Sequence, residues 1–346
     1  MEQIKVADFY KGLSFEGFLL VRTSQKRTSN NGGNYLDMTL ADNSADINAK
    51  VWDPMATPPD AGSVIKVRAA ITEYNGRLQM RVDKFRPTMD GDRVDVGDLV
   101  ASAPEPPDAM RKEIDDTVAA FQNPVLKTLC QALIAQVSDQ LMYYPAAQRM
   151  HHAERSGLMH HMTSMLRAAK ALLPCYPFLD ADLVLAGVLV HDLSKITEMR
   201  ADTLGNVSEY TTEGLLLGHL VVGVSQVREA ARQHNIPQDD EYVLLLQHMI
   251  ISHHGIAEYG SPRPPMFPEA EMLSILDEMD ARMNEMESVL KRTPRGVFSE
   301  KIWSLERRMY HPRYLGEPEE TAPAPEEPQP ARTERPNAQS AYEGLL

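Results

Sequence analysis

Side chains that can bind metals lie inside segments of this chain that are otherwise apolar. The clearest case is residues 182–199, DLVLAGVLVHDLSKITEM, which are almost wholly apolar until His191 and Asp192. The apolar run predicts a central helix that begins near Ala181 and carries an imidazole and a carboxylate into the interior. Burying such groups is costly unless they are satisfied. Either the two side chains hydrogen-bond to each other at a helix end, or a metal ion binds both.

The His-Asp pair is not isolated. Four further segments place His or Asp in similar apolar surroundings: GLMHHMTSML (157–166), GLLLGHLVVGV (214–224), LLLQHMIISHHG (244–255) and LSILDEMDARM (273–283). Imidazole and carboxylate together form the ligand set of Mn, Fe, Co, Ni or Zn, and no cysteine is positioned for a structural zinc site. Five such helical segments predict a metal site in the core of a helical bundle.

The first part of the chain has a different pattern. Short apolar runs at 15–24, 34–43, 45–54, 63–74 and 77–85 are separated by Gly, Asn, Asp and Pro, and Asn75-Gly76 is typical of a tight hairpin. Five short antiparallel strands of this size fit an OB-like barrel. An unrelated small β domain is the alternative.

The chain is therefore expected to be a multidomain α+β protein. We expect an OB-like β-barrel at 1–90, a linker at 91–108, an all-α domain at 109–314 and a disordered Pro/Glu-rich tail at 315–346. Apolar spacing predicts helices near 108–121, 124–137, 156–173, 181–193, 213–233, 240–253, 268–290 and 297–309.

Composition limits the classes of protein that the chain can belong to. A formal charge of -14 argues against a protein that coats nucleic acid through a broad positive surface. The two cysteines, Cys130 and Cys175, are too few for a disulfide framework and suit a reducing compartment. No apolar run approaches the ~20 residues that a membrane span requires, so we expect a cytoplasmic protein with no membrane partner.

The order of the metal-binding side chains resembles that of a known family. His161, His191-Asp192, His219, His253-His254 and Asp280 resemble the ligands of two-metal HD-domain phosphohydrolases, with the HD pair in HDLSK. Together with HHAERSGLMHH, EYTTEGLLLGH, LLLQHMIISHHGIAEYGSPRPP and LDEMDARMN, the pattern is similar to the YhaM-type 3′→5′ exoribonucleases of bacteria. These enzymes also carry an N-terminal OB-fold. The resemblance covers roughly residues 10 to 314.

This resemblance implies a site for two divalent metal ions. One would be bound by His161, His191, Asp192 and Asp280, and the other by Asp192, His219, His253 and His254, so that Asp192 bridges them. We expect Mn²⁺, with Fe, Co, Ni or Zn as alternatives. A carboxylate can span two cations ~3.5 to 4 Å apart, and water held between them is acidified enough to supply a hydroxide nucleophile.

Other residues are candidates for catalysis or substrate binding. Lys195 follows His191 by one helical turn and could reach a phosphate oxygen, although a solvated lysine at a helix end is the alternative. Asp277 shares a helix face with Asp280, which by itself makes either a candidate ligand. Only Asp280 matches the terminal Asp of the family, and the alternative role for Asp277 is to orient a ligand imidazole. Helical spacing directs His161 inward and leaves His160 at the rim. Candidate contacts with substrate are His151, His152, Lys26, Arg27, Trp52 and Arg263.

These expectations lead to a function. The resemblance implies a metal-dependent 3′→5′ exoribonuclease that acts on the 3′ ends of single-stranded RNA and releases nucleoside monophosphates. Single-stranded DNA is a second candidate substrate. One alternative is an HD-type phosphodiesterase for cyclic or small nucleotides, although no GYP tripeptide follows His253-His254. A second alternative is an inactive single-strand-binding adaptor, for which converging metal ligands would be unnecessary. Homo-oligomerisation is left open.

Overall fold

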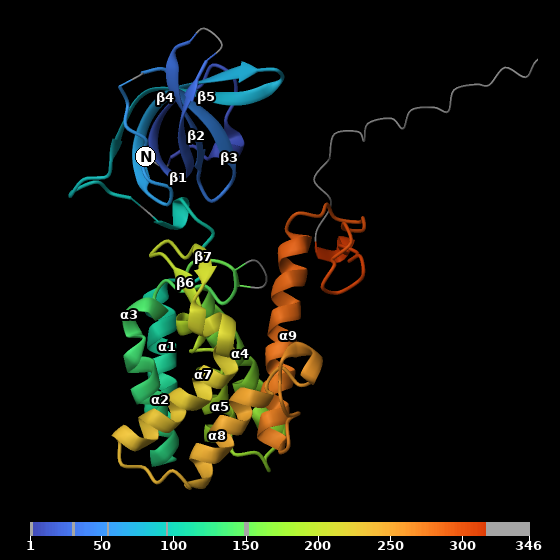
Figure 1. Ribbon diagram of the computed structural model, residues 1–346. Helices are drawn as coiled ribbons and strands as arrows, with labels where there is room; N and C mark the ends of the chain where they lie inside the picture. The colour runs from blue at the N-terminus through green and yellow to red at the C-terminus, as the bar shows by residue number, and fades with distance from the viewer. Residues whose placement is uncertain (1–2, 30–31, 54, 95, 149–151, 316–346) are drawn as a thin grey trace, which may run out of the picture. The chain divides into compact units, whose positions relative to one another are not determined.

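The N-terminal domain is a closed five-stranded barrel. A computed structural model of the chain describes residues 3–29, 32–53, 55–94, 96–148 and 152–315. A short 3-10 helix (η1, Val6–Asp8) precedes β1 (Ser14–Thr28), β2 (Asn34–Ala41), β3 (Asp46–Val51), β4 (Val64–Tyr74) and β5 (Arg77–Pro87). The strand order is β1-β2-β3-β5-β4, and β4 pairs with β1 to close the barrel (Figure 1). Only β3 and β5 pair in parallel among these strands. The predicted OB-like barrel is confirmed.

Alternation of apolar and polar side chains explains the barrel. In β2, Leu36, Met38 and Leu40 are buried, whereas the residues between them face outward. The β4–β5 hairpin turns at Asn75 and Gly76, with φ values of 51° and 74°. These positive angles are the ones that a type I′ turn requires at both central residues. The short-range pattern therefore determined both the strands and this turn.

The second domain is helical, which confirms the predicted class. Its helices are α1 (Pro107–Ala120), α2 (Pro124–Gln136), α3 (Ser138–Leu141), α4 (Gly157–Leu172), α5 (Ala181–Val190), α6 (Lys195–Glu198), α7 (Thr212–Gln233), α8 (Glu241–Ser252) and α9 (Pro268–Leu290). The apolar helix α5 lies in the middle and packs against α1, α2, α4 and α8 (Figure 1). Asp180 caps the start of α5 by accepting from the Leu183 N–H.

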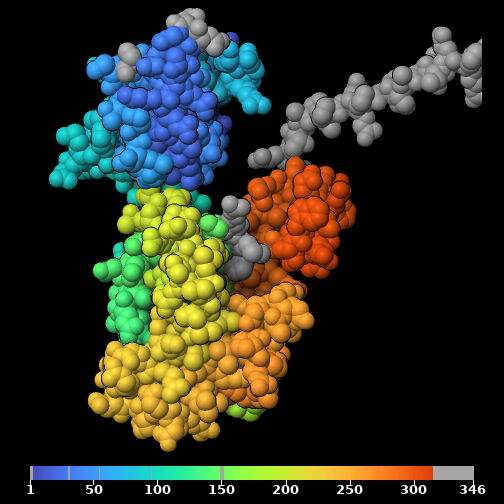
Figure 2. Space-filling view, viewed as in Figure 1, coloured from blue at the N-terminus to red at the C-terminus, as the bar shows by residue number. Residues whose placement is uncertain are grey.

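Two features of this part of the chain differ from the sequence-based expectation. A small two-stranded sheet, β6 (Met199–Ala201) with β7 (Val207–Tyr210), connects α6 to α7 and was not expected. The helix predicted at 297–309 is wrong, because this segment instead forms isolated antiparallel bridges, Phe298 with Tyr310 and Ile302 with Arg307. Residues 286–315, red at their end in Figure 2, belong to a separate compact unit.

The structure describes most of the segment predicted as a linker but almost none of the segment predicted as a tail. Residues 91–108 include a 3-10 helix (η2, Val96–Asp98), after which Leu99 and Val100 are buried. Ser102 then bridges to Arg155, just before α4. The predicted disordered tail lies outside the described residues apart from Leu315, in the 3-10 helix η5 (Arg313–Leu315). Among the helices of the described residues, none is both long and apolar enough to cross a membrane.

Candidate metal centre and nucleic-acid interface

Five helical elements bring the predicted ligands together inside the helical domain. His161 lies on α4, His191 and Asp192 follow α5 directly, and His219 lies on α7. His253 and His254 follow α8, while Asp277 and Asp280 lie on α9. The side chains of His161, His191, Asp192 and His253 are at most 2% exposed. Segments that are far apart in sequence therefore create one buried cluster of imidazoles and carboxylates.

Asp192 lies between two sets of histidines. Its Oδ2 atom is 3.4 Å from Nε2 of His191 and 3.7 Å from Nε2 of His161. Its Oδ1 atom is 3.5 Å from Nε2 of His219 and 3.7 Å from Nε2 of His253. The two oxygens of one carboxylate therefore face two different groups of imidazole nitrogens.

Three atoms at this point are buried without a hydrogen-bond partner in the described residues. They are Oδ1 of Asp192, Nε2 of His219 and Nε2 of His253. Leaving such atoms unsatisfied costs free energy, so a structure that keeps three of them together implies a missing partner. Imidazole nitrogens and a carboxylate oxygen fit a divalent transition metal, and His219, His253 and His254 form a group that could hold one.

The other ring nitrogen of each histidine is fixed by an oxygen. Nδ1 of His161 lies 2.7 Å from Oδ2 of Asp280, and Nδ1 of His219 lies 3.1 Å from Oε2 of Glu198. Nδ1 of His191, His253 and His254 donates to the backbone carbonyls of Val188, Ile250 and Tyr259, at 3.0, 2.7 and 2.8 Å. In His191, His253 and His254 the carbonyl acceptor places a proton on Nδ1 and directs Nε2 toward the cluster, as metal-bound histidines require.

The two carboxylates on α9 contact different nitrogens of His161. Oδ1 of Asp277 lies 3.3 Å from Nε2 of His161 and 4.0 Å from Nε2 of His191, so it joins the ligand atoms. Oδ2 of Asp280 instead contacts Nδ1 of His161 and, at 2.8 Å, Nε2 of His152. Asp277 is therefore a further candidate ligand. Asp280 forms another group that could hold a metal, together with His152 and His161, so its role as a ligand stays a prediction.

Glu198 is a functional candidate that the sequence interpretation missed. The helix α7 is interrupted at Gly218, where φ is 67° and ψ is 164°. The break frees the backbone N–H of His219, which donates to Oε1 of Glu198 at 3.3 Å, while Nδ1 contacts Oε2. One carboxylate thus holds both the backbone and the ring of His219. The sequence offered no signal for this pair, because β6 and β7 bring α6 beside α7.

Lys195 lies at the cluster, as predicted from its spacing. Its Nζ atom is 2.6 Å from Oδ2 of Asp192. Its side chain is only 13% exposed, so it lies against the cluster rather than extending into solvent. The ammonium therefore balances the carboxylate of Asp192 and lies where it would contact a phosphate oxygen placed near that carboxylate.

Burial and paired charges set the protonation states of the cluster. Burial lowers the pKa of a histidine, but hydrogen bonds with Asp277 and Asp280 outweigh it and raise the pKa of His161 to about 10. Burial, reinforced by the neighbouring His191, lowers the pKa of His253 well below its usual range. For Asp192, burial opposes ionisation, yet Lys195 and His191 hold its pKa well below the usual range. The carboxylates are ionised, and His253 is neutral, which is the form that binds a metal.

The upstream histidines are linked to the cluster through Asp280. His152 is buried in a left-handed conformation with φ of 51° and reaches Asp280 through Nε2. Its Nδ1 lies 3.1 Å from Nδ1 of His160, which also contacts Oε1 of Glu154 at 2.7 Å. His160, expected at the rim, is half-buried in this network. His151 lies outside the described residues.

The barrel presents an aromatic face on β2 and β3. The rings of Tyr35 and Trp52 stack, with centroids 4.8 Å apart, and Trp52 is 57% exposed. Nζ of Lys50 lies 4.8 Å from the centroid of the Tyr35 ring. Arg27 pairs with Tyr35 across β1 and β2 and forms an ion pair with Asp37. Stacked rings beside cations are typical of surfaces that bind single strands.

Two predicted contacts lie apart from these features. Lys26 pairs with Leu36, a core residue, so alternation places it on the other face of β1 from Arg27. Arg263 is exposed in the loop that follows His254, and within the described part of the chain it makes no polar contact with the cluster. The predicted contacts of both residues with substrate stay predictions.

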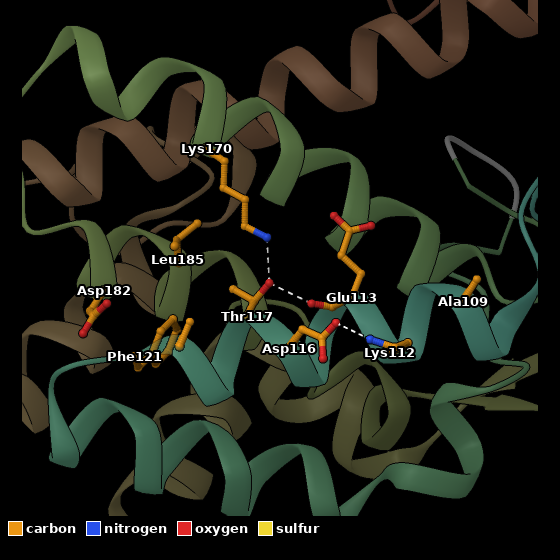
Figure 3. A pocket seen from close by; sticks show the side chains of 10 residues that line it. Ala109, Lys112, Glu113, Asp116, Thr117, Phe121, Lys170, Asp182 and Leu185 are labelled. Carbon is orange, nitrogen blue, oxygen red and sulfur yellow. Dashed lines mark hydrogen bonds and ion pairs between the residues drawn. The ribbon is translucent and has the colours of Figure 1, made fainter.

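A cavity of about 430 Å³ elsewhere in the helical domain is unrelated to the cluster (Figure 3). It is lined from α1, α4 and α5, and its charged groups have polar partners. Lys170 donates to Oγ1 of Thr117 at 2.7 Å, and Lys112 pairs with Asp116 at 2.6 Å. Because these lining groups are already paired, the cavity does not call for a charged ligand.

Comparisons with known proteins agree with this organisation. The family model described as the HD domain matches residues 158–282, and the one described as the OB-fold nucleic acid binding domain matches residues 19–88. The chain therefore contains an HD domain and an N-terminal OB-fold.

Solved structures that are similar to parts of the chain share little sequence with it. The HD domain of the phosphodiesterase PgpH from L. monocytogenes is 17% identical, with 49% of this chain and 80% of that chain covered and a TM-score of 0.27. A domain of replication protein A from Methanococcus maripaludis is 20% identical, with 25% and 94% covered and a TM-score of 0.23.

Proposed function

We propose that this protein is a metal-dependent 3′→5′ exonuclease that hydrolyses single-stranded RNA, and single-stranded DNA as a second substrate, to nucleoside monophosphates. An HD domain joined to an OB-fold supports a phosphodiesterase that acts on nucleic acid. The observation that carries the proposal is the placement of Asp192, whose two oxygens face separate groups of imidazole Nε2 atoms. The RNA substrate and the 3′→5′ polarity are taken from the YhaM-type resemblance of the motifs.

Two metal ions, with Mn²⁺ as our first choice, are proposed for the two groups of atoms around Asp192. One group comprises Nε2 of His161 and His191 with Oδ1 of Asp277, and the other comprises the Nε2 atoms of His219, His253 and His254. When bound, such ions acidify a water and polarise a phosphoryl oxygen. Their charge exceeds that of Asp192 and Asp277, which supports attraction of phosphate into an acidic protein.

The residues of the chain have distinct tasks in this proposal. Asp192 holds the two groups at a fixed separation, while Asp280 and Glu198 fix the rings of His161 and His219. Lys195 is placed beside Asp192, where its ammonium would contact a phosphate oxygen and stabilise charge that develops there. On the barrel, Tyr35, Trp52 and Lys50 would stack on bases and contact the backbone of the same strand.

The test uses three substrates with Mn²⁺ in parallel. A 5′-labelled unstructured RNA, the same RNA blocked by a 3′ phosphate and a cyclic dinucleotide are incubated with the full chain. We expect the unblocked RNA to yield a ladder that shortens from the 3′ end. Asp192→Asn keeps the size of the side chain but removes its charge, and it should abolish turnover. Asp139→Asn, at an exposed carboxylate on α3, is the matched control.

The same assay can reject the proposal. Turnover of the cyclic dinucleotide with intact RNA would assign the chain to small-nucleotide phosphodiesterases. Turnover of no substrate with any divalent metal would favour a strand-binding adaptor. Unchanged RNA hydrolysis by Asp192→Asn would show that the cluster around Asp192 is not the catalytic site.

A further inference from the structure

Residues 291–314 carry a charge opposite to that of the chain as a whole. We refer to them as the basic segment. They contain seven Lys or Arg and two Glu, a formal charge of +5 in a chain of -14. All the cations except the half-buried Arg295 are exposed; they are Lys291, Arg292, Lys301, Arg307, Arg308 and Arg313. Apolar spacing predicted a helix over much of this region and indicated no function for it.

Large aromatic side chains are exposed in the same segment. Phe298, Trp303, Tyr310 and Tyr314 are 64, 81, 42 and 84% exposed. A single exposed aromatic side chain is ordinary on a protein surface, but four in one short segment mark a surface with a binding role. The basic segment therefore combines positive charge with accessible aromatic rings.

Backbone hydrogen bonds hold these side chains in place. The N–H of Ser299 donates to the carbonyl of Met309 at 2.8 Å, and that of Ile302 donates to the carbonyl of Arg307 at 2.8 Å. Ile302 and Ser299 are buried beneath them. The rings and cations are thus presented by a folded unit, which limits the entropy that binding would have to overcome.

Most of the positive charge of the segment is not neutralised within the described residues, although Lys291 pairs with Glu287 at 2.9 Å. Arg307, Arg308 and Arg313 form no ion pair with any carboxylate in the described ranges. Arg167 on α4, by contrast, contacts both Glu105 and Glu113. Exposed and unpaired guanidinium groups remain available to an anionic partner.

The ammonium of Lys301 lies over a ring of the same segment. Its Nζ atom is 4.6 Å from the centroid of the Trp303 ring. A cation above an exposed indole provides a stacking face and a phosphate contact at one position, the combination that binds unpaired nucleotides without sequence preference. Duplex nucleic acid would use the charge but not the rings, because its bases are already stacked.

We propose that the basic segment is a second binding surface for single-stranded nucleic acid, in addition to the barrel. This inference rests on the proposed function for its choice of RNA as the strand. Trp303 and its neighbouring aromatics stack on bases, while Arg307 and Arg308 contact phosphates. An anionic membrane or a second copy of the chain would use similar chemistry, and the tests below separate these partners.

The two tryptophans of the chain allow a direct test. Trp52 lies on the barrel and Trp303 in the basic segment, and the chain has no others. In the Trp52→Phe variant, Trp303 is the only indole reporter. Titration with an oligouridylate RNA in EDTA, which prevents hydrolysis, should quench its fluorescence to saturation. The absence of quenching in this variant would overturn the proposal.

Charge reversal provides a second test. The Arg307→Glu/Arg308→Glu variant should bind fluorescein-labelled oligouridylate at least about tenfold more weakly, with a salt slope about 0.7 smaller for each phosphate that is no longer neutralised. Trp303→Ala should weaken binding roughly tenfold. The matched control is Arg228→Glu/Arg232→Glu, which makes the same charge change at exposed positions on α7 and should bind as the wild type does.

The outcomes distinguish this inference from the proposed function. Hydrolysis of bis(p-nitrophenyl) phosphate needs no strand contact, so the charge-reversal variant should retain it. If the wild type binds RNA through the basic segment but hydrolyses nothing, the inference stands and the proposed function fails. If RNA is hydrolysed but the variants bind it as tightly as the wild type, the inference fails alone.

Two further measurements address the competing partners. Vesicles of phosphatidylcholine and phosphatidylglycerol are tested by sedimentation, and oligomeric state is tested by analytical ultracentrifugation. Loss of vesicle binding with unchanged RNA binding would assign the segment to a membrane surface. Loss of self-association with unchanged RNA binding would assign it to a second copy. Either result overturns the proposal.

Discussion

Asp280 holds His161 by Nδ1, the ring nitrogen that does not face the cluster. The distance from Oδ2 of Asp280 to this nitrogen is 2.7 Å, whereas Asp277 lies 3.3 Å from Nε2 of the same ring. One helix, α9, therefore provides a carboxylate to each nitrogen of one imidazole. The arrangement separates a group that would bind the metal from a group that orients a ligand.

Different effects on metal binding follow for these two carboxylates. Asp277→Asn should lose metal at its position and should not recover activity with added Mn²⁺. Asp280→Asn should weaken metal binding by about 10- to 100-fold and recover activity when Mn²⁺ is raised. Metal content by mass spectrometry and activity against Mn²⁺ concentration measure both effects. The reverse pattern, with recovery only in Asp277→Asn, would restore Asp280 as the ligand.

Glu198 should matter for metal affinity although it is outside the group of ligand atoms. Removing its carboxylate in Glu198→Ala leaves both the ring and the backbone N–H of His219 without an acceptor. We expect about a 10- to 100-fold loss of metal affinity, with a smaller loss in Glu198→Gln, which keeps an acceptor oxygen. Glu209→Gln on β7, 60% exposed, is the control. Equal metal affinity in all three variants would contradict this role.

Metal binding should release a proton from His161. Because its pKa is raised to about 10 without metal, the ring is an imidazolium at neutral pH, held between Asp277 and Asp280. A metal needs the lone pair of Nε2, so that proton must leave. Apparent affinity should therefore rise with pH from neutrality and level off above about 10. His253, whose pKa is lowered, is already neutral and should contribute no proton.

Calorimetry in buffers of different ionisation enthalpy measures this release. At a mildly alkaline pH the observed enthalpy should depend on the buffer, with a slope that reports protons given up on binding. In Asp280→Asn the pKa of His161 falls, so the slope should be smaller. A slope of zero for the wild type would mean that His161 is not protonated in the metal-free protein.

The sequence predicted the elements of the fold better than their details. Apolar Leu36, Met38 and Leu40 alternate with outward-facing residues, which indicates directly which face of the strand is buried. Asn75-Gly76 indicates a tight turn from two adjacent residues. Local patterns were therefore sufficient to predict the barrel. The segment 297–309 has helix-like apolar spacing at Ile302, Leu305 and Met309, but Pro294 and Gly296 precede it, and Glu306 adopts a φ of 53°. The apolar spacing alone could not show that this segment forms turns and isolated bridges instead of a helix.

The residues of the candidate site could be predicted from the sequence only where burial determines which side chains face the interior. His161, His191, His219 and His253 lie within or directly after apolar helical stretches, and all four are buried. Asp277 and Asp280, however, share one face of α9, and their roles depend on which nitrogen of His161 each meets. That choice depends on where the side chains of α9 meet His161 on α4, which no local pattern encodes. Glu198 depends in the same way on the β6–β7 connection.

Gly218 should be required for the position of His219. Its φ of 67° and ψ of 164° lie in a region that is essentially restricted to glycine. In Gly218→Ala, the backbone must either hold a strain of about 1–3 kcal/mol or continue the helix through this point. The second response would move His219 away from Glu198. Both thermal stability and metal affinity should therefore fall.

Gly91→Ala is the matched control, because Gly91 also has a positive φ of 96° and has open space around its Cα. It should lose stability without losing metal affinity, as seen in thermal unfolding and Mn²⁺ titration. Metal affinity that is unchanged in Gly218→Ala would show that the interruption of α7 does not position the ligand.

Trp52 should contribute to strand binding through the face of its ring. Trp52→Ala removes a side chain that stacks on Tyr35 and is 57% exposed, and it should weaken oligouridylate binding by roughly tenfold. Tyr74→Ala removes an aromatic side chain of comparable exposure, 67%, at the β4–β5 hairpin and should leave affinity unchanged. Fluorescence anisotropy in EDTA measures binding without hydrolysis. If both substitutions weaken binding equally, the strand follows a path across the barrel other than β2 and β3.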